Sequence, residues 1–489
     1  MFINSKIYRS PAAVILYFWF AFIVWRVFQL GFHHDDWALL TVTSAYGEHL
    51  MEGGRTRPLN VALGYLGVRV FGANAWAWHI YGAFLLLINA LVMYGFCRAL
   101  SLKIEANYPV NGLATGVAVA WMLFPWNLGY TAWPVMFPGL VATALFMGAL
   151  WLLVQNPASF SSVRKSCYCL VLSSLIYEAF WFAVIPMSMM VWGLVGIKQF
   201  RIALRAFGAL AATQLALVIW NLTLSHWGSG GGKQLSAEWL ALLLASFTIP
   251  IKLALLFFAA VAIKAVASGR DNASFRIALL LGASAVGMLI SMGLYALAGY
   301  SLVSRGLSSR TYIAVDIWIA TGFTVCAACF ARTLSRHNAI TTLCTVTLLL
   351  GLGAKNLRET HKWAVSWKFH QGLLASLPLP ELLKTKPDSV VMFSRSTQSG
   401  EIDNLTAFWD TTSAVYVTQP ALRPAIQQGL QFAVGRHQEM LTTWDGHAVA
   451  QSWCSRPQTR LWSVPTGAVY LINQNNQLEL APTPWMQPC

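Results

Sequence analysis

The chain has 489 residues, of which 57% are hydrophobic and 10% are charged. Because an average soluble domain is about a quarter charged, this composition excludes a protein whose main solvent is water. The formal net charge of +15 would suit nucleic-acid binding, but Lys and Arg lie mainly at the ends of apolar segments. That arrangement is typical of a polytopic membrane protein and gives no support to a nucleic-acid partner.

Apolar runs long enough to cross a bilayer occur along most of the chain. The first follows a basic N-terminal flank, is too long for a signal-peptide core, and lacks a small-residue cleavage site, so we expect an uncleaved span. The predicted spans number about eleven and cover residues 11–31, 76–97, 109–127, 132–154, 167–182, 182–197, 204–225, 239–263, 277–300, 312–331 and 338–354.

The charges between these spans predict the orientation. Fourteen Lys and Arg residues fall on the side of the N-terminus and six on the opposite side, and basic loops are retained in the cytoplasm. We therefore expect a bacterial inner-membrane protein with a cytoplasmic N-terminus and a periplasmic C-terminus. The fourteen are Lys6, Arg9, Arg98, Lys103, Arg164, Lys165, Lys198, Arg201, Arg205, Lys264, Arg270, Arg276, Arg332 and Arg336; the six are Arg55, Arg57, Arg69, Lys233, Arg305 and Arg310.

The sequence predicts two domains. Residues 1–355 form a transmembrane domain, and residues 356–489, which lack long apolar runs, form a second domain. Short β-like pieces such as DSVVMFSR flank the more helical PAIQQGLQFAVG, a pattern that predicts a small periplasmic α/β domain. It contains Cys454 and Cys489, and in an oxidising compartment these two would form a disulfide.

The first outer segment, residues 32–75, is long for a connection and begins with GFHHDDWALL. Asp35 and Asp36 stand at the membrane edge, where two adjacent carboxylates favour a cation, a basic ligand or a shared proton. A solvated loop or a helix N-cap is the alternative. His33 and His34 would orient an aspartate, bind phosphate or ligate a metal, or simply pack at the interface.

Two helix-like stretches follow, Trp37 to Met51 and Pro58 to Phe71, and their polar and apolar faces suit helices that lie along the membrane surface. Between them, EGGRTRPLN carries Arg55 and Arg57. Two permanent cations at this place suit a phosphate or the aspartates, or alternatively lipid headgroups.

The Asp35-Asp36 pair, the surface-helix pattern, the GGRTRPL segment, the many spans and the terminal outer domain together resemble the GT-C superfamily of membrane glycosyltransferases. The acidic pair followed by this Gly-Arg-Pro-Leu segment is most similar to the GtrII-like, aminoarabinose-transferase-like and pilin glycosyltransferase-like groups. The resemblance implies a mainly α, GT-C-like bundle. It also implies a polyprenyl-phosphate-sugar donor and a catalytic acidic residue at Asp35 or Asp36.

In such a reaction a carboxylate takes the proton of an acceptor hydroxyl, while cations stabilise the departing lipid phosphate. The predicted phosphate-binding residues are Arg55, Arg57, Lys233, Arg305 and Arg310; interfacial arginines or a solvated loop are the alternatives. Glu178, in an apolar segment, is predicted to act in catalysis or to form a structural ion pair. The same two readings apply to Arg26, Lys252 and Asp316, for which internal pairing or snorkelling is favoured.

The sequence leaves the cofactor and the acceptor open. Two carboxylates suit Mg²⁺ or Mn²⁺, but basic side chains can neutralise the donor without a metal. The acceptor is expected to be a periplasmic glycan such as lipopolysaccharide, a lipid or a pilin-like protein. A transporter or lipid flippase is the alternative function, although no paired repeat halves with matching broken helices are visible.

Overall fold

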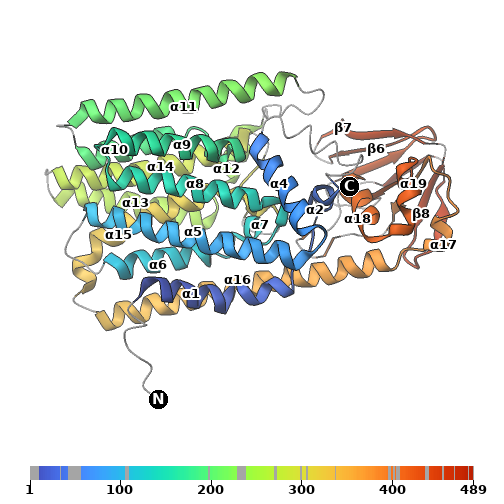
Figure 1. Cartoon of the computed structure of the whole chain (residues 1–489), viewed down its shortest axis with the longest axis horizontal. Coiled ribbons are helices and arrows are strands. Elements are labelled where there is room, and N and C mark those ends of the chain that lie inside the picture. The colour runs from blue at the N-terminus through green and yellow to red at the C-terminus, as the bar shows by residue number, and fades with distance from the viewer. Residues whose placement is uncertain are drawn as a thin grey trace, which may run out of the picture.

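The computed structural model shows a bundle of roughly parallel helices, with a smaller strand-containing region at one end (Figure 1). It describes residues 10–33, 35–41, 57–104, 110–196, 199–227, 238–268, 272–297, 300–303, 307–335, 338–394, 398–399, 402–403, 408–434, 440–453, 456–466, 468–482 and 484–487.

Each predicted span has a helical counterpart within the described residues. The helices are α1 (Pro11–Phe22), continued by the 3₁₀ turn η2 (Val24–Phe28), α5 (Ala75–Ile104), α6 (Val110–Met122), α8 (Phe137–Gln155), α9 (Phe160–Ile176), α10 (Val184–Val195), α11 (Phe200–Trp227), α13 (Ile249–Ser268), α14 (Asn272–Leu297), α15 (Val315–Ser335) and α16 (Asn338–Ala375).

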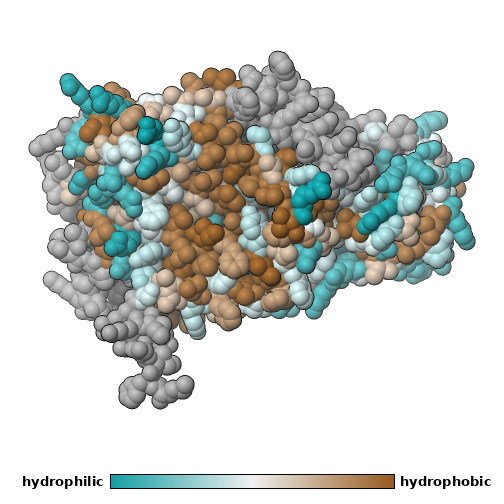
Figure 2. Space-filling model, in the orientation of Figure 1, coloured by the Kyte–Doolittle hydropathy of each residue, from teal (hydrophilic) through white to brown (hydrophobic). Residues whose placement is uncertain are grey.

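Six of the described helical segments are long and apolar enough to cross a membrane: Pro11–Phe28, Ala75–Ile104, Pro134–Gln155, Arg201–Ile219, Ile249–Ala267 and Ala273–Leu297. Shorter apolar helices, α6, α10 and α15 among them, run beside these six. Figure 2 shows a wide hydrophobic band across the middle of the bundle, with hydrophilic residues towards both ends. The chain is therefore a mainly α, polytopic membrane protein with a small C-terminal α/β region.

Several helix boundaries differ from the sequence prediction, and three of the differences affect the architecture. The fifth and sixth spans meet not at residue 182 but across a break between Ile176 and Val184, which contains the short 3₁₀ helix η5 (Glu178–Phe180). The eighth span is divided into α12 (Trp239–Ala245) and α13, whose second residue is Pro250. Because proline lacks an N–H and fixes φ, it suits the first turn of a new helix and disfavours an uninterrupted one.

The third difference concerns α16, which continues past residue 354 to Ala375. The proposed boundary between residues 355 and 356 thus lies inside this helix. The extension projects from the bundle to the C-terminal region (Figure 1) and ends beside it. The helix does not stop where its apolar run stops, because polar residues on one face do not end a helix whose other face is packed.

The C-terminal α/β region, defined here as residues 379–487, contains two four-stranded sheets. In the first, β1 (Ser389–Phe393) lies between β4 (Gln431–Val434) and β8 (Ala468–Ile472), parallel to both, and β9 (Leu478–Leu480) pairs antiparallel with β8. The second is antiparallel, in the order β10 (Trp485–Gln487), β5 (Met440–Trp444), β6 (Ala448–Trp453) and β7 (Arg456–Pro465). Short pieces complete the region: β2 (Gln398–Ser399), β3 (Ile402–Asp403), α17 (Leu379–Leu382), α18 (Phe408–Thr418), η8 (Pro420–Leu422) and α19 (Arg423–Gln427).

Side-chain contacts fasten this region to the bundle. Gln419 donates a hydrogen bond to the carbonyl oxygen of Leu374 at the end of α16, at 2.9 Å. The hydroxyls of Thr41 and Ser413 lie 3.1 Å apart and connect the end of α2 (Asp35–Leu40) to α18. Cys454 and Cys489, the predicted disulfide partners, lie outside the described residues, so their pairing stays a prediction.

Two short helices lie between the bundle and the C-terminal α/β region: α2 and α4 (Pro58–Phe71) (Figure 1). They come from the first outer segment. The second predicted surface helix, Pro58 to Phe71, has the bounds of α4. The first is described only as far as Leu40, because residues 42–56 lie outside the described part of the chain.

Candidate active site

Asp36 is a buried anchor of the segment that enters α2. Only 1% of this residue is exposed. One carboxylate oxygen accepts the backbone N–H of His33 at 2.8 Å, and the other accepts the backbone N–H of Val135 at 2.7 Å. A carboxylate that accepts two main-chain N–H groups fixes both segments, so Asp36 joins α2 to the 3₁₀ turn η4 (Pro134–Met136), which leads into α8.

Asp35 differs from its neighbour in exposure. It is the first residue of α2 and is half-buried, whereas Asp36 is buried. A negative charge in the first turn of a helix is favoured by the helix dipole. Of the two predicted catalytic carboxylates, Asp35 is therefore the one with surface available to a ligand.

Aromatic side chains of α16 pack around this segment. The rings of Trp363 and His33 meet edge to face at 5.1 Å, and Trp367 stacks on Trp37 at 6.1 Å. A Cβ atom on Gly31 would come within 2.0 Å of the Trp367 ring. Only glycine fits at this position, so the extension of α16 and the acidic segment are packed against each other.

Arg310 stands on aromatic rings at the same end of the bundle. It belongs to the 3₁₀ helix η7 (Leu307–Tyr312), and its guanidinium carbon lies 5.0 Å from the Trp133 ring centre and 5.6 Å from that of Tyr300. The Trp133 indole N–H donates to the carbonyl oxygen of His33 at 3.0 Å. Trp133 thus contacts both the cation and the acidic segment, which places Arg310 and Asp36 in one site.

Asp316 forms hydrogen bonds with the segment that precedes Trp133. This fully buried residue of α15 accepts hydrogen bonds from Trp126 at 2.6 Å and from Tyr130 at 2.5 Å. Tyr130 lies in the short helix α7 (Leu128–Thr131), three residues before Trp133. Internal pairing, the reading favoured for Asp316, is confirmed, and Asp316 is a positioning residue for the aromatic support of Arg310.

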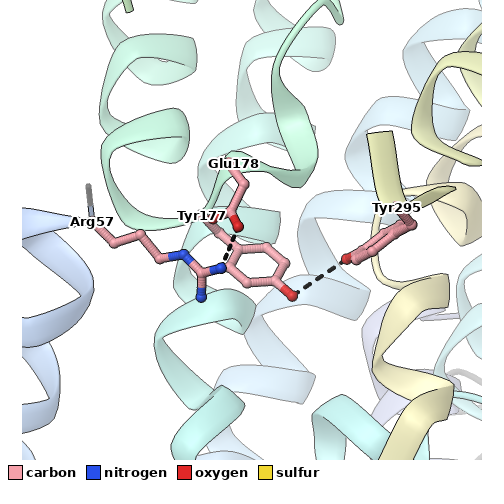
Figure 3. A network of polar contacts seen from close by, with 4 residues as sticks. All are labelled: Arg57, Tyr177, Glu178 and Tyr295. Atoms are coloured by element: carbon pink, nitrogen blue, oxygen red, sulfur yellow. Dashed lines mark hydrogen bonds and ion pairs between the residues drawn. The ribbon is translucent and has the colours of Figure 1, made fainter. Parts of the chain in front are cut away.

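A second polar group surrounds Arg57, as Figure 3 shows. Arg57, just before α4, forms an ion pair with Glu178, and its guanidinium carbon lies 5.1 Å from the centre of the Tyr177 ring. The Tyr295 hydroxyl of α14 donates to the Tyr177 hydroxyl at 3.3 Å. The ion pair predicted as one of two readings of Glu178 is present, and it joins the start of α4 to the break between α9 and α10.

The electrostatics of this group keep Arg57 charged. Burial alone would lower the pKa of Arg57, but the nearby Glu178 and Tyr177 more than offset it, so the pKa is raised above its ordinary value. The side chains of Arg57 and Glu178 are 30% and 23% exposed. The pair is therefore partly accessible, and an incoming anion can compete with Glu178 for the guanidinium.

The structure brings together a part of the predicted site. Asp35, Asp36, His33, Arg57, Glu178 and Arg310 are described, and they belong to segments at the end of the bundle that faces the C-terminal α/β region. His34, Arg55, Lys233 and Arg305 lie outside the described residues. Sequence reasoning missed Trp133, Tyr295, Tyr300 and Asp316 as parts of the site, although the polar residues in FPWNLGYTAW were a usable signal.

No group of three or more His, Cys, Asp or Glu side chains that would hold a metal ion occurs among the described residues. Both Asp36 oxygens already accept main-chain N–H groups, and Glu178 pairs with Arg57. The Mg²⁺ or Mn²⁺ ion suggested by the sequence therefore stays a prediction.

Few known proteins are similar to this chain by the comparisons that follow. No protein-family model matches the chain, and no curated protein gives a significant match. Among solved structures, the chain is similar to the crystal structure of ArnT from Cupriavidus metallidurans bound to undecaprenyl phosphate, with 12% sequence identity and a TM-score of 0.42. The alignment covers 86% of this chain and 88% of that chain. The fold and the site define a polytopic membrane protein with a polar site at one end of its helix bundle.

Proposed function

We propose that the chain is a GT-C-like membrane glycosyltransferase that moves a sugar from a polyprenyl-phosphate donor to an acceptor outside the cytoplasm. The observation that carries the proposal is the contact chain from Asp36 through His33 and Trp133 to Arg310. It joins a carboxylate segment to a permanent cation where the apolar bundle ends. A lipid phosphate whose chain lies in the bilayer presents its charge at this level.

Asp35 is the general base of this proposal. The acceptor hydroxyl attacks the anomeric carbon, its proton passes to the Asp35 carboxylate, and the bond from that carbon to the phosphate oxygen breaks. Both electrons of the bond leave with the phosphate. The products are the glycosylated acceptor and the polyprenyl phosphate, and the proton then returns to solvent. Asp36 supports the reaction by fixing the backbone that carries Asp35.

Arg310 and Arg57 are the proposed phosphate ligands. Trp133 and Tyr300 form cation–π contacts with Arg310, whose N–H groups can also donate to phosphate oxygens. Arg57 binds a phosphate when the phosphate replaces Glu178 as its ion-pair partner. Both cations would stabilise negative charge that grows on the departing phosphate. Lys233, Arg55 and Arg305 stay predictions for the same role, and dependence on Mg²⁺ or Mn²⁺ stays one to be checked by chelation.

The charges support a periplasmic site. The adjoining ends of α5 and α6, α8 and α9, α10 and α11, and α13 and α14 lie opposite the C-terminal α/β region, and these helices carry basic residues of the predicted cytoplasmic set near those ends. By the positive-inside rule that end is cytoplasmic, and the site faces the periplasm of a bacterial inner membrane.

Binding of undecaprenyl phosphate tests the assignment. Purified protein in nanodiscs should bind it more tightly than phosphatidylcholine, and the Arg310→Ala and Arg57→Ala variants should weaken binding. An exposed arginine at the other end of the bundle, Arg98, supplies the Arg98→Ala control. If undecaprenyl phosphate binds no better than phosphatidylcholine, the proposed donor is wrong.

A further inference from the structure

A separate cleft of about 650 Å³ lies between the first outer segment and the C-terminal α/β region. One wall comes from the end of α2 and from α4, and the other from α18 and α19. The cleft is lined by Leu40, Thr41, Val68, Arg69, Gly72, Ala73, Tyr416, Val417, Arg423 and Gln427. It shares no lining residue with the groups around Arg57 and Arg310.

Arginines hold opposite walls of the cleft, and each is anchored by its own segment. The Arg69 Nε and Nη2 atoms donate to the Tyr65 hydroxyl at 3.1 and 2.7 Å. Arg423 donates from Nε to the carbonyl oxygen of Tyr416 at 2.9 Å and from Nη2 to that of Val417 at 3.3 Å. Each guanidinium has five N–H donors, so each keeps donors for a ligand while its position is fixed.

The described lining of the cleft is cationic. None of these ten residues is acidic, and Thr41 and Gln427 add polar groups to the lining. Two preorganised arginines facing one space favour a phosphate or carboxylate, which accepts paired N–H bonds from a guanidinium.

Exposed apolar side chains also lie near the cleft. The helix α4, which supplies Val68 and Arg69, exposes Leu66 and Val70 elsewhere on its surface, and Trp76 is exposed just beyond it. Large exposed apolar side chains on a short helix at the end of the bundle suit contact with lipid. A ligand with an anionic head and an apolar anchor therefore fits this place better than a fully soluble one.

The cleft adjoins the proposed general base. Leu40, in its wall, is five residues after Asp35 in the same helix, a distance of about 8 Å along the helix axis. The cleft and Asp35 therefore share the short helix α2.

We propose that this cleft binds the anionic headgroup of a lipid-anchored saccharide, the acceptor of the reaction, between Arg69 and Arg423. The proposal rests on the proposed function, because it takes Asp35 as the point where the acceptor hydroxyl is activated. It makes the acceptor a phosphate- or carboxylate-bearing glycolipid.

The test uses phosphatidylinositol 4-phosphate with a fluorescent acyl chain as the probe, because it carries a phosphorylated polyol on a lipid anchor. The full chain is placed in phosphatidylcholine nanodiscs, and binding is compared for wild type, Arg69→Gln, Arg423→Gln and the double variant. Lys384→Gln is the matched control, since Lys384 is exposed in the C-terminal α/β region but outside the cleft. Each variant is first checked by thermal melting. If loss of the Arg423 hydrogen bonds unfolds its segment, Arg69→Gln alone decides.

We expect each single substitution to weaken probe binding about tenfold, the double variant to weaken it further, and Lys384→Gln to leave it unchanged. Soluble inositol 1,4-bisphosphate should compete only at much higher concentration. Equal binding by the double variant and wild type would overturn the proposal, and equal potency of the soluble competitor would overturn the lipid-anchored acceptor.

Undecaprenyl phosphate, measured on the same samples, separates this proposal from the donor assignment. Its binding should be unchanged in the Arg69→Gln/Arg423→Gln variant. An equal loss of both ligands would make the cleft a part of the donor site and overturn its assignment to the acceptor. Failure of wild type to bind undecaprenyl phosphate would reject the donor assignment and not the cleft.

Discussion

At the scale of single residues, the two proposed phosphate ligands, Arg310 and Arg57, differ in their surroundings. Arg310 lies over two aromatic rings, whereas Arg57 is paired with a carboxylate. A planar guanidinium offers paired N–H donors to a ligand as well as a cation–π contact with Trp133, and a lysine ammonium cannot reproduce the paired donors. Shape as well as charge should therefore matter at position 310.

For Arg310 we predict that Arg310→Ala weakens undecaprenyl phosphate binding more than Arg310→Lys does. Loss of a charged hydrogen bond to phosphate is worth about 1.5 to 3 kcal/mol, or roughly ten- to a hundredfold in affinity, and Lys retains only the charge. Equilibrium binding in nanodiscs measures both. Wild-type affinity in Arg310→Ala would remove this residue from the donor site.

For the Arg57 and Glu178 pair we predict an asymmetry. Glu178→Gln removes the carboxylate that competes with the donor phosphate for Arg57, so donor affinity should rise or stay equal, whereas Arg57→Ala should lower it. Glu178→Gln should also lower the melting temperature, since the pair connects α4 to the break after α9. Equal loss of donor binding in both variants would instead make Glu178 a direct participant.

At the scale of elements, the fit between α16 and the acidic segment depends on Gly31. A side chain at this position meets Trp367, and repacking an overfilled core costs about 1 to 3 kcal/mol. We predict that Gly31→Ala lowers the melting temperature and reduces sugar transfer. Gly372→Ala in α16, where an added Cβ meets nothing within 4 Å, is the control and should melt at or above the wild-type temperature. Equal melting of Gly31→Ala and wild type would contradict this packing.

Most of the helices can be predicted from the sequence, and the features that cannot be predicted have physical causes. Apolar runs identify the helices because the bilayer demands them. They do not locate the break inside residues 239–263, where Pro250 begins a new helix, or the end of α16, whose outer turns pack Trp363 and Trp367 against the acidic segment. The acidic pair was visible because charge is expensive beside lipid. Tyr295 was not, because its role arises only from contacts with distant segments.

At the scale of the whole molecule, the site and the C-terminal α/β region lie at one end of the bundle, opposite the basic ends of helices such as α5, α9 and α11. We predict that a cysteine introduced at Gln427, in α19, reacts with a membrane-impermeant maleimide added from the periplasmic side. A cysteine at Arg98, near the end of α5, should react only after the cytoplasmic face is opened. The opposite pattern would invert the topology.

We propose that Asp35 takes the proton of the acceptor while Asp36 holds the segment that enters α2 in place. Asp35→Asn should therefore fold, insert and bind undecaprenyl phosphate like wild type, yet lose sugar transfer by about a hundred- to ten-thousandfold. Asp36→Asn should also lose transfer, but with a lower melting temperature. An asparagine amide cannot accept both the His33 and the Val135 N–H groups, and an unsatisfied buried donor costs about 1 to 3 kcal/mol.

The most direct measurement is the rate of sugar transfer from a defined undecaprenyl-phosphate sugar by wild type and Asp35→Asn, each in nanodiscs, with a bacterial envelope extract as acceptor and donor binding measured on the same samples. If Asp35 is the general base, the two proteins should bind the donor equally, and the transfer rate should be at least about a hundredfold lower in the variant. Transfer by Asp35→Asn at the wild-type rate would contradict it.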